Sequence, residues 1–199
     1  MIHDRTNWQT FNLAAIQQRL AWLQQQPDGI IFCKDSGVHY VAVTKDRSHI
    51  KLSLIEKVNL HTDLLQSIFD FHNPLHLDCA DIDAIAIEAA TQCFGVEFDS
   101  RLTVAIQDGR EYLEQQKPDR QYDIIMTDVF FGNGYFPHRL ATKEFYQLCE
   151  KRLSSDGVVL VNLLQRDEFY AEKVKTFQSV FSQVCVCPWK DINSVLIGN

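Results

Sequence analysis

Three aspartates follow directly after apolar stretches of the sequence, where their carboxylates are suited to bind a ligand. Asp81 comes after the run LDCA, Asp108 after LTVAIQ, and Asp128 after YDIIMT. In an open α/β sheet, ligands bind at the carboxyl ends of the strands. A carboxylate in the position of Asp81 can accept hydrogen bonds from both hydroxyls of a ribose, and one in the position of Asp108 can meet an exocyclic amine. The spacing therefore predicts a nucleoside-sized site built on three strand ends.

Each of these aspartates also has a structural interpretation. An aspartate at a strand-to-helix junction is a common helix N-cap, whose side chain accepts hydrogen bonds from backbone N–H groups. A single aspartate of this kind is explained well enough by capping. Three at successive strand ends favour a shared site, because those ends meet at one edge of a parallel sheet.

The elements that position these residues alternate between strands and helices. Helical patterns cover residues 82–94, 110–116, 145–153 and 169–180. Strand patterns cover residues 102–107, 122–127, 158–164, 183–189 and 194–198. Continuous apolar strands between helices predict a mostly parallel sheet covered on both faces. The last two strands are joined by only a few residues, so we expect them to be antiparallel neighbours.

The N-terminal part of the sequence has a different pattern of predicted elements. Apolar residues at helical spacing predict a helix over Leu13–Leu23. Three short runs, at residues 30–35, 39–44 and 50–55, predict strands and a β-hairpin, with KDRS as a turn. We therefore expect an N-terminal helix and β-hairpin region, residues 1–72, followed by an α/β domain, residues 73–199.

Composition narrows the classes of partner. The net charge of −7 argues against a nucleic-acid or anionic-membrane surface, because phosphate binding needs clustered Lys and Arg. The N-terminus lacks a signal-peptide pattern, so we expect a cytoplasmic protein. The six cysteines are expected to be free, buried thiols, and Cys185 and Cys187 are too close in sequence for an ordinary disulfide. We expect no metal site, because Pro74 breaks the helical spacing between His72 and His76.

The sequence resembles the spermidine synthases (polyamine aminopropyltransferases), which use the methyltransferase type of Rossmann fold. The resemblance covers roughly residues 81–164 and is carried by DIDAIAIEAATQCFG, QDGREYL, QYDIIMTDVF and FPHRLATKEFYQLCEKRLSSDGVVLVNL. A weaker similarity lies in LLQSIFDFHNP. The implied fold is a mostly parallel methyltransferase-type Rossmann-like sheet with a C-terminal antiparallel strand, after a small N-terminal helix and β-hairpin.

The resemblance also implies roles for individual residues. Asp81 corresponds to the acid that binds the ribose, Asp108 to the acid that binds the adenine amine, and Gly109 is assigned to the same site. Gln66 resembles a glutamine that touches the nucleoside, and Asp128 resembles the catalytic aspartate. The implied substrates are decarboxylated S-adenosylmethionine, or S-adenosylmethionine, and a small-molecule amine, with no metal. Family members often dimerise through their N-terminal parts, so a homodimer is an expectation for this chain.

The chemistry implied is attack by an amine on a carbon next to a sulfonium, with methylthioadenosine leaving. The amine must be neutral to react, so the carboxylate of Asp128 would accept its proton and hold it in line. Aromatic residues near this point either shield the cation and exclude water or pack in the protein interior. These residues are Phe130, Phe131, Tyr135 and Phe136.

Two departures from the family pattern keep other functions open. Phe131 stands where the family has a second acid that grips a diamine. The buried strand and glycine-rich turn expected before Asp81 are also absent, since Leu77 runs directly into Asp78. Either the printed sequence omits residues between these two, or the protein lacks this strand and turn. In the second case, the strands that end at Asp81 and Asp128 pair directly, or the sheet splits. The alternatives are an S-adenosylmethionine-dependent methyltransferase acting on a small molecule and a non-catalytic scaffold or binding protein.

Overall fold

The computed structural model describes ten stretches of the 199-residue chain. They are residues 21–22, 24–35, 40–46, 49–55, 76–94, 96, 98, 100–130, 136–190 and 192–199. Gln66 and most of the helix predicted over Leu13–Leu23 lie outside these stretches, although residues 21–22 and 24–25 are helical. The chain forms two compact units, Met1–Gln107 and Asp108–Asn199. The predicted domain boundary at residues 72–73 also falls outside the described stretches and stays a prediction.

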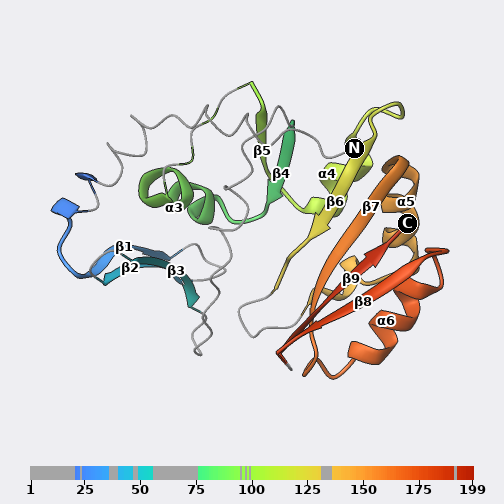
Figure 1. The fold of residues 1–199 in the computed structure, drawn as a ribbon. Coiled ribbons are helices and arrows are strands. Elements are labelled where there is room, and N and C mark those ends of the chain that lie inside the picture. Colours follow the sequence, from blue (N-terminus) through green and yellow to red (C-terminus); the bar gives the residue numbers. More distant parts are fainter. Residues whose placement is uncertain are drawn as a thin grey trace, which may run out of the picture. The chain divides into compact units, whose positions relative to one another are not determined.

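The first unit contains an antiparallel sheet and a parallel strand pair (Figure 1). The antiparallel sheet has the order β1 (Gly29–Asp35), β2 (Tyr40–Asp46) and β3 (His49–Ile55), which confirms the β-rich N-terminal region. β4 (Leu77–Asp81) and β5 (Leu102–Ile106) pair in parallel and are connected by α3 (Ala84–Phe94). α3 packs on β1 and β2, with Ala89 and Cys93 of the helix buried against Phe32 and Val43.

The second unit contains a four-stranded sheet in the order β6–β7–β9–β8 (Figure 1). Its strands are β6 (Tyr122–Thr127), β7 (Leu153–Leu164), β8 (Val184–Trp189) and β9 (Asn193–Gly198). Its helices are α4 (Gly109–Gln115), the 3-10 helix η2 (His138–Leu140), α5 (Lys143–Arg152) and α6 (Tyr170–Gln178). β6 and β7 are parallel, whereas β9 is antiparallel to both β7 and β8, as predicted for the last two strands.

The core of the second unit lies between the sheet and helices α5 and α6. Val159, Val161 and Leu163 alternate along β7 and are fully buried, because they project from one face of the sheet. They pack with aromatic residues of these helices, including Tyr146 and Phe177. Residues on the other face of β6 are open, with Ile124 57% and Met126 55% exposed. Cover on both faces was predicted, but among the described residues of this unit only one face is packed.

The α/β class is confirmed, but the parallel strands do not form one sheet. β4 and β6 do not pair, and each parallel pair belongs to a sheet of its own. The absence of the strand-helix step expected near Leu77 and Asp78 stays a prediction.

Three details differ from the sequence-based expectations. The helix predicted from Ile82 begins at Ala84, because Asp83 caps it. β7 begins at Leu153 rather than Val158, because Leu153 already pairs with Tyr122 before the register shifts. The expectation of six buried thiols is wrong, since three cysteines are exposed: Cys33, Cys185 and Cys187.

No helix in the described part of the chain combines the length and the apolar character that crossing a membrane requires.

Candidate active site

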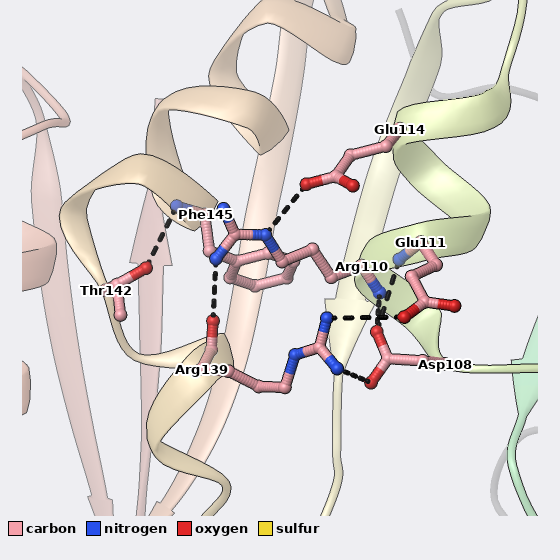
Figure 2. A network of polar contacts seen from close by, with 7 residues as sticks. All are labelled: Asp108, Arg110, Glu111, Glu114, Arg139, Thr142 and Phe145. Atoms are coloured by element: carbon pink, nitrogen blue, oxygen red, sulfur yellow. Dashed lines mark hydrogen bonds and ion pairs between the residues drawn. The ribbon is translucent and has the colours of Figure 1, made fainter.

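Asp108 caps helix α4 with one carboxylate oxygen and meets an arginine with the other (Figure 2). Its Oδ1 accepts hydrogen bonds from the backbone N–H groups of Arg110, at 2.9 Å, and Glu111, at 3.2 Å. Its Oδ2 lies 3.3 Å from Nη1 of Arg139, and the side chain is only 17% exposed. The capping interpretation is thus correct, and it leaves Oδ2 as the oxygen that faces outward from the helix.

Two arginines connect the start of α4 to the segment before α5 (Figure 2). Arg139, in η2, also approaches Oε1 of Glu111 at 3.6 Å. Arg110 bonds Glu114 at 2.9 Å one turn along α4 and donates to the carbonyl of Arg139 at 3.3 Å. This network fixes Asp108 in place. A ligand amine that binds Oδ2 must share this oxygen with Arg139 or displace the arginine.

Gly109 opens α4 and leaves space beside the backbone. A methyl group added at its Cα would meet no atom within 4 Å. By contrast, the same addition at Gly157 would come within 2.8 Å of the Tyr122 carbonyl oxygen. The space at Gly109 is therefore available to a ligand that approaches the backbone next to Asp108.

Asp81 ends β4 and forms a local turn with its carboxylate. Its Oδ1 accepts a hydrogen bond from the backbone N–H of Asp83 at 2.7 Å. Asp83 in turn caps α3, accepting from Ile85 at 2.9 Å and Ala86 at 3.3 Å. The cap of this helix is therefore Asp83, so Asp81 is not needed for capping.

Asp128 follows β6 and pairs with Asn162 of the neighbouring strand. The two strands run parallel with Thr127 opposite Val161, which brings the next residue of each strand side by side. Nδ2 of Asn162 donates to Oδ1 of Asp128 at 3.1 Å. Burial raises the pKa of the Asp128 carboxyl, and the hydrogen bond from Asn162 offsets part of that rise. A carboxyl with a raised pKa holds a proton more readily than an exposed aspartate does.

Asn162 is a candidate functional residue that the sequence analysis missed. Its Oδ1 is buried and has no hydrogen-bond partner among the residues that the structure describes. Because an ionised carboxylate can only accept, the amide must turn its nitrogen to Asp128, which leaves the oxygen open to a donor. A buried acceptor without a donor costs about 1–3 kcal/mol, so a bound N–H group would relieve this cost. The signal in the sequence was a single amide inside the apolar run VVLVNLL.

The predicted site residues fall in both units. Asp108, Gly109 and Asp128 belong to the second unit and Asp81 to the first. Gln66 lies outside the described residues, so its role stays a prediction, as does the convergence of the three aspartates on one ligand. Phe136 is buried in the core and contacts Phe130 edge to face at 6.2 Å, which supports the packing interpretation for these two aromatic residues.

Comparison with known families gives one match that covers well over half of the chain. Residues 62–188 match the family model described as the spermine/spermidine synthase domain. This range contains all of the predicted site residues.

Two curated relatives match shorter stretches. Polyamine aminopropyltransferase 2 of Pseudomonas aeruginosa is 38% identical over 92 residues, which is 43% of this chain and 26% of that protein. The eEF1A lysine and N-terminal methyltransferase of Mus musculus is 32% identical over 107 residues, 50% of this chain and 15% of that protein. The chain thus matches only a minor part of each relative's length.

Solved structures show the same fold. A probable spermidine synthase from Corynebacterium glutamicum superposes with a TM-score of 0.68 at 17% identity, covering 87% of this chain and 81% of the other. Human methyltransferase-like protein 13, solved in complex with SAH, gives a TM-score of 0.56 at 28% identity, with 61% and 60% covered.

Proposed function

The chain belongs to the spermine/spermidine synthase domain family, and from this premise we propose that it transfers an alkyl group from a sulfonium nucleoside to an amine. The group proposed is the aminopropyl group of decarboxylated S-adenosylmethionine, and the acceptor is a small-molecule amine. The similarity to an aminopropyltransferase over 92 residues supports this choice. The cytoplasm as location and a homodimer as assembly remain part of the proposal.

The observation that carries the proposal is the pairing of Asp128 with Asn162 at the carboxyl ends of two parallel strands. Asp128 offers a carboxylate, and Asn162 offers a buried carbonyl oxygen that lacks a donor. An incoming amine carries N–H donors that suit both oxygens. Since Phe131 replaces the family's second acid, the amide of Asn162 supplies a neutral second contact for the acceptor.

Individual residues of the chain have separate roles in the proposed reaction. Asp128 accepts the proton that the amine nitrogen loses as its lone pair forms the new carbon–nitrogen bond. The electrons of the broken carbon–sulfur bond stay on sulfur, which becomes a neutral thioether in the leaving nucleoside. Burial raises the pKa of Asp128, which makes it a stronger base once it is ionised. Asp108 and the open space at Gly109 are proposed to hold the adenine end, and Asp81 the ribose.

A second candidate is methyl transfer to an amine of a small molecule or a protein. Similarity to an eEF1A lysine and N-terminal methyltransferase favours it, as does 28% identity to a methyltransferase-like protein solved with SAH. The nucleophile is an amine in both reactions, so the Asp128–Asn162 pair serves either. The donor group alone distinguishes them.

Product analysis separates the two candidates. The purified chain is incubated with an amine panel and either decarboxylated S-adenosylmethionine or S-adenosylmethionine, and the nucleoside products are identified by mass spectrometry. Methylthioadenosine formed in an amine-dependent way supports aminopropyl transfer, and S-adenosylhomocysteine supports methyl transfer. Asp128→Asn should lower either rate by about 100-fold or more, because it removes the base. If neither product forms, the scaffold alternative replaces both.

A further inference from the structure

Two exposed thiols lie next to each other on the outer strand of the four-stranded sheet. Cys185 and Cys187 belong to β8, and their Sγ atoms are 3.5 Å apart. Alternate residues of a strand project from the same face, so both thiols face the same side. Both are open to solvent. The remaining exposed cysteine among the described residues, Cys33, lies in the other unit.

We propose that Cys185 and Cys187 form a thiol–disulfide exchange site that takes a low-molecular-weight disulfide of the glutathione type and closes reversibly to an intrachain disulfide. The amine-transfer chemistry proposed above does not use these thiols, so the two proposals stand or fall separately.

The short spacing in sequence disfavours an ordinary disulfide, but the contact between the sulfurs and the position of β8 make a strained, reversible one feasible. Alternate Cα atoms of a strand are about 6.4–6.8 Å apart. Cα atoms joined by a disulfide are usually about 4.4–6.8 Å apart, most often near 5.5–6 Å, so β8 must shorten slightly at Val186. Among the described strands only β9 pairs with β8, because β8 is the edge of its sheet. Pro188, the next residue, has no N–H to donate to β9.

The exchange balances without a further oxidant. One protein thiolate attacks a sulfur of the small disulfide, whose S–S bond breaks and releases one small thiolate. The second protein thiolate then attacks the protein sulfur of the mixed disulfide and releases the other small thiolate. The two protons lost by Cys185 and Cys187 pass to the two released thiolates. The protein pair is oxidised by two electrons, and the small disulfide is reduced to two thiols.

The thiol–thiol contact couples the two groups. The hydrogen bond with Cys185 is the main cause that raises the pKa of the Cys187 thiol. Because the two sulfurs lie 3.5 Å apart, either thiolate can begin the exchange and the other can complete it. No group of three or more metal-binding side chains occurs within the part of the chain that the structure describes. The bond between the two sulfurs forms as the small disulfide is reduced to two thiols.

The test equilibrates the full-length chain with oxidised and reduced glutathione and then blocks free thiols with N-ethylmaleimide. Trypsin releases both cysteines in one peptide, residues 176–190. The expected result is this peptide lighter by two hydrogens and carrying no maleimide, with both changes reversed by added reduced glutathione. Cys33, exposed but alone, should carry glutathione or maleimide and serves as the internal control.

Cys187→Ser removes one thiol of the pair and tests the step that resolves the mixed disulfide. In this variant the mixed disulfide at Cys185 should accumulate about tenfold or more above its level in the unchanged chain, where the neighbouring thiol resolves it. Blocked thiols at both positions, under conditions that modify Cys33, would overturn the proposal. So would equal amounts of mixed disulfide in the two proteins, or a disulfide that links two chains.

Discussion

At the scale of single residues, Asp108 has both a structural role and a proposed binding role. One of its carboxylate oxygens accepts a hydrogen bond at the N-terminus of α4, and the other lies next to Arg139. A helix cap and a ligand-binding acid are therefore compatible in one residue, since the two oxygens face different groups. The structural interpretation of Asp108 does not compete with the functional one.

Two substitutions of Asp108 separate its roles. Asp108→Ala removes the cap and should destabilise the chain by about 1 kcal/mol, measured by urea unfolding. Asp108→Ser keeps a capping oxygen and should retain nearly all of this stability. Both lack the carboxylate, so both should weaken methylthioadenosine binding. A serine variant that binds methylthioadenosine as tightly as the unchanged chain would remove Asp108 from the nucleoside site.

Asn162 should tune the acidity of its neighbour. Its hydrogen bond lowers the pKa of Asp128 against the opposing effect of burial. Asn162→Ala removes this hydrogen bond, so the pKa of Asp128 should rise further. The acidic limb of the pH–rate profile would then move to higher pH, since Asp128 must be ionised to accept a proton. Carbon-13 NMR titration of the Asp128 carboxyl measures the same shift without turnover, and an unchanged titration would contradict the pairing.

At the scale of elements, a buried ion pair connects α6 to the stretch that leads into η2. Nζ of Lys173, in α6, contacts Oδ2 of Asp167 and donates to the carbonyl of Phe136 at 3.4 Å. Phe136 is the first residue of that described stretch. Lys173 thus anchors the chain where it approaches η2.

Breaking this ion pair should destabilise the second unit strongly. Lys173→Met leaves the carboxylate of Asp167 buried without its partner, which typically costs about 3–5 kcal/mol in urea unfolding. Adding Asp167→Leu should recover much of that loss, because no unpaired charge remains. Equal stability of the single variant and the unchanged chain would show that the pair is not formed.

Asp167 also gives the pair a pH dependence. Burial alone would raise its pKa, but the Lys173 ammonium and backbone N–H groups bring it below the ordinary 3.8. A lowered pKa means that the stabilisation is present above the unfolded value and is lost as the pH falls through the folded one. Asp167→Asn should therefore remove part of the acid-induced loss of stability below about pH 4.

Most elements follow from patterns that are local in the sequence. The apolar run YDIIMT predicted β6 at its observed bounds, and helical spacing predicted α5. The exposure of β8 could not be predicted from QVCVCPW, because an edge position depends on which strands pair. Asn162 was missed for the same reason, since its proposed role depends on the strand register that places it next to Asp128.

At the scale of the whole molecule, the main feature is the division of the parallel strands into two sheets. β4–β5 and β6–β7 are each parallel, and no described strand joins them. We expect that a missing strand-helix step between Leu77 and Asp78 causes this division. Without that step, the chain order is compatible either with direct pairing of β4 and β6 or with two separate sheets.

The mass of the segment around Leu77 and Asp78 decides whether that step exists. In the protein expressed from its natural gene, the tryptic fragment that spans these two residues should match the mass calculated from the printed sequence if the step is truly absent. A mass larger by the equivalent of about 30 residues would restore a complete strand-helix step. In the first case we expect weak binding of the methionine end of the substrate, because no glycine-rich turn receives it. Methylthioadenosine, which lacks that end, should still bind.

Calorimetric titration of methylthioadenosine tests the shared nucleoside site most directly. One molecule should bind per chain, and Asp81→Asn and Asp108→Ser should each weaken binding by about tenfold or more, since each removes a charged hydrogen-bond acceptor. Absence of binding to the unchanged chain, or equal affinity in both variants, would contradict a site in which these aspartates hold one nucleoside.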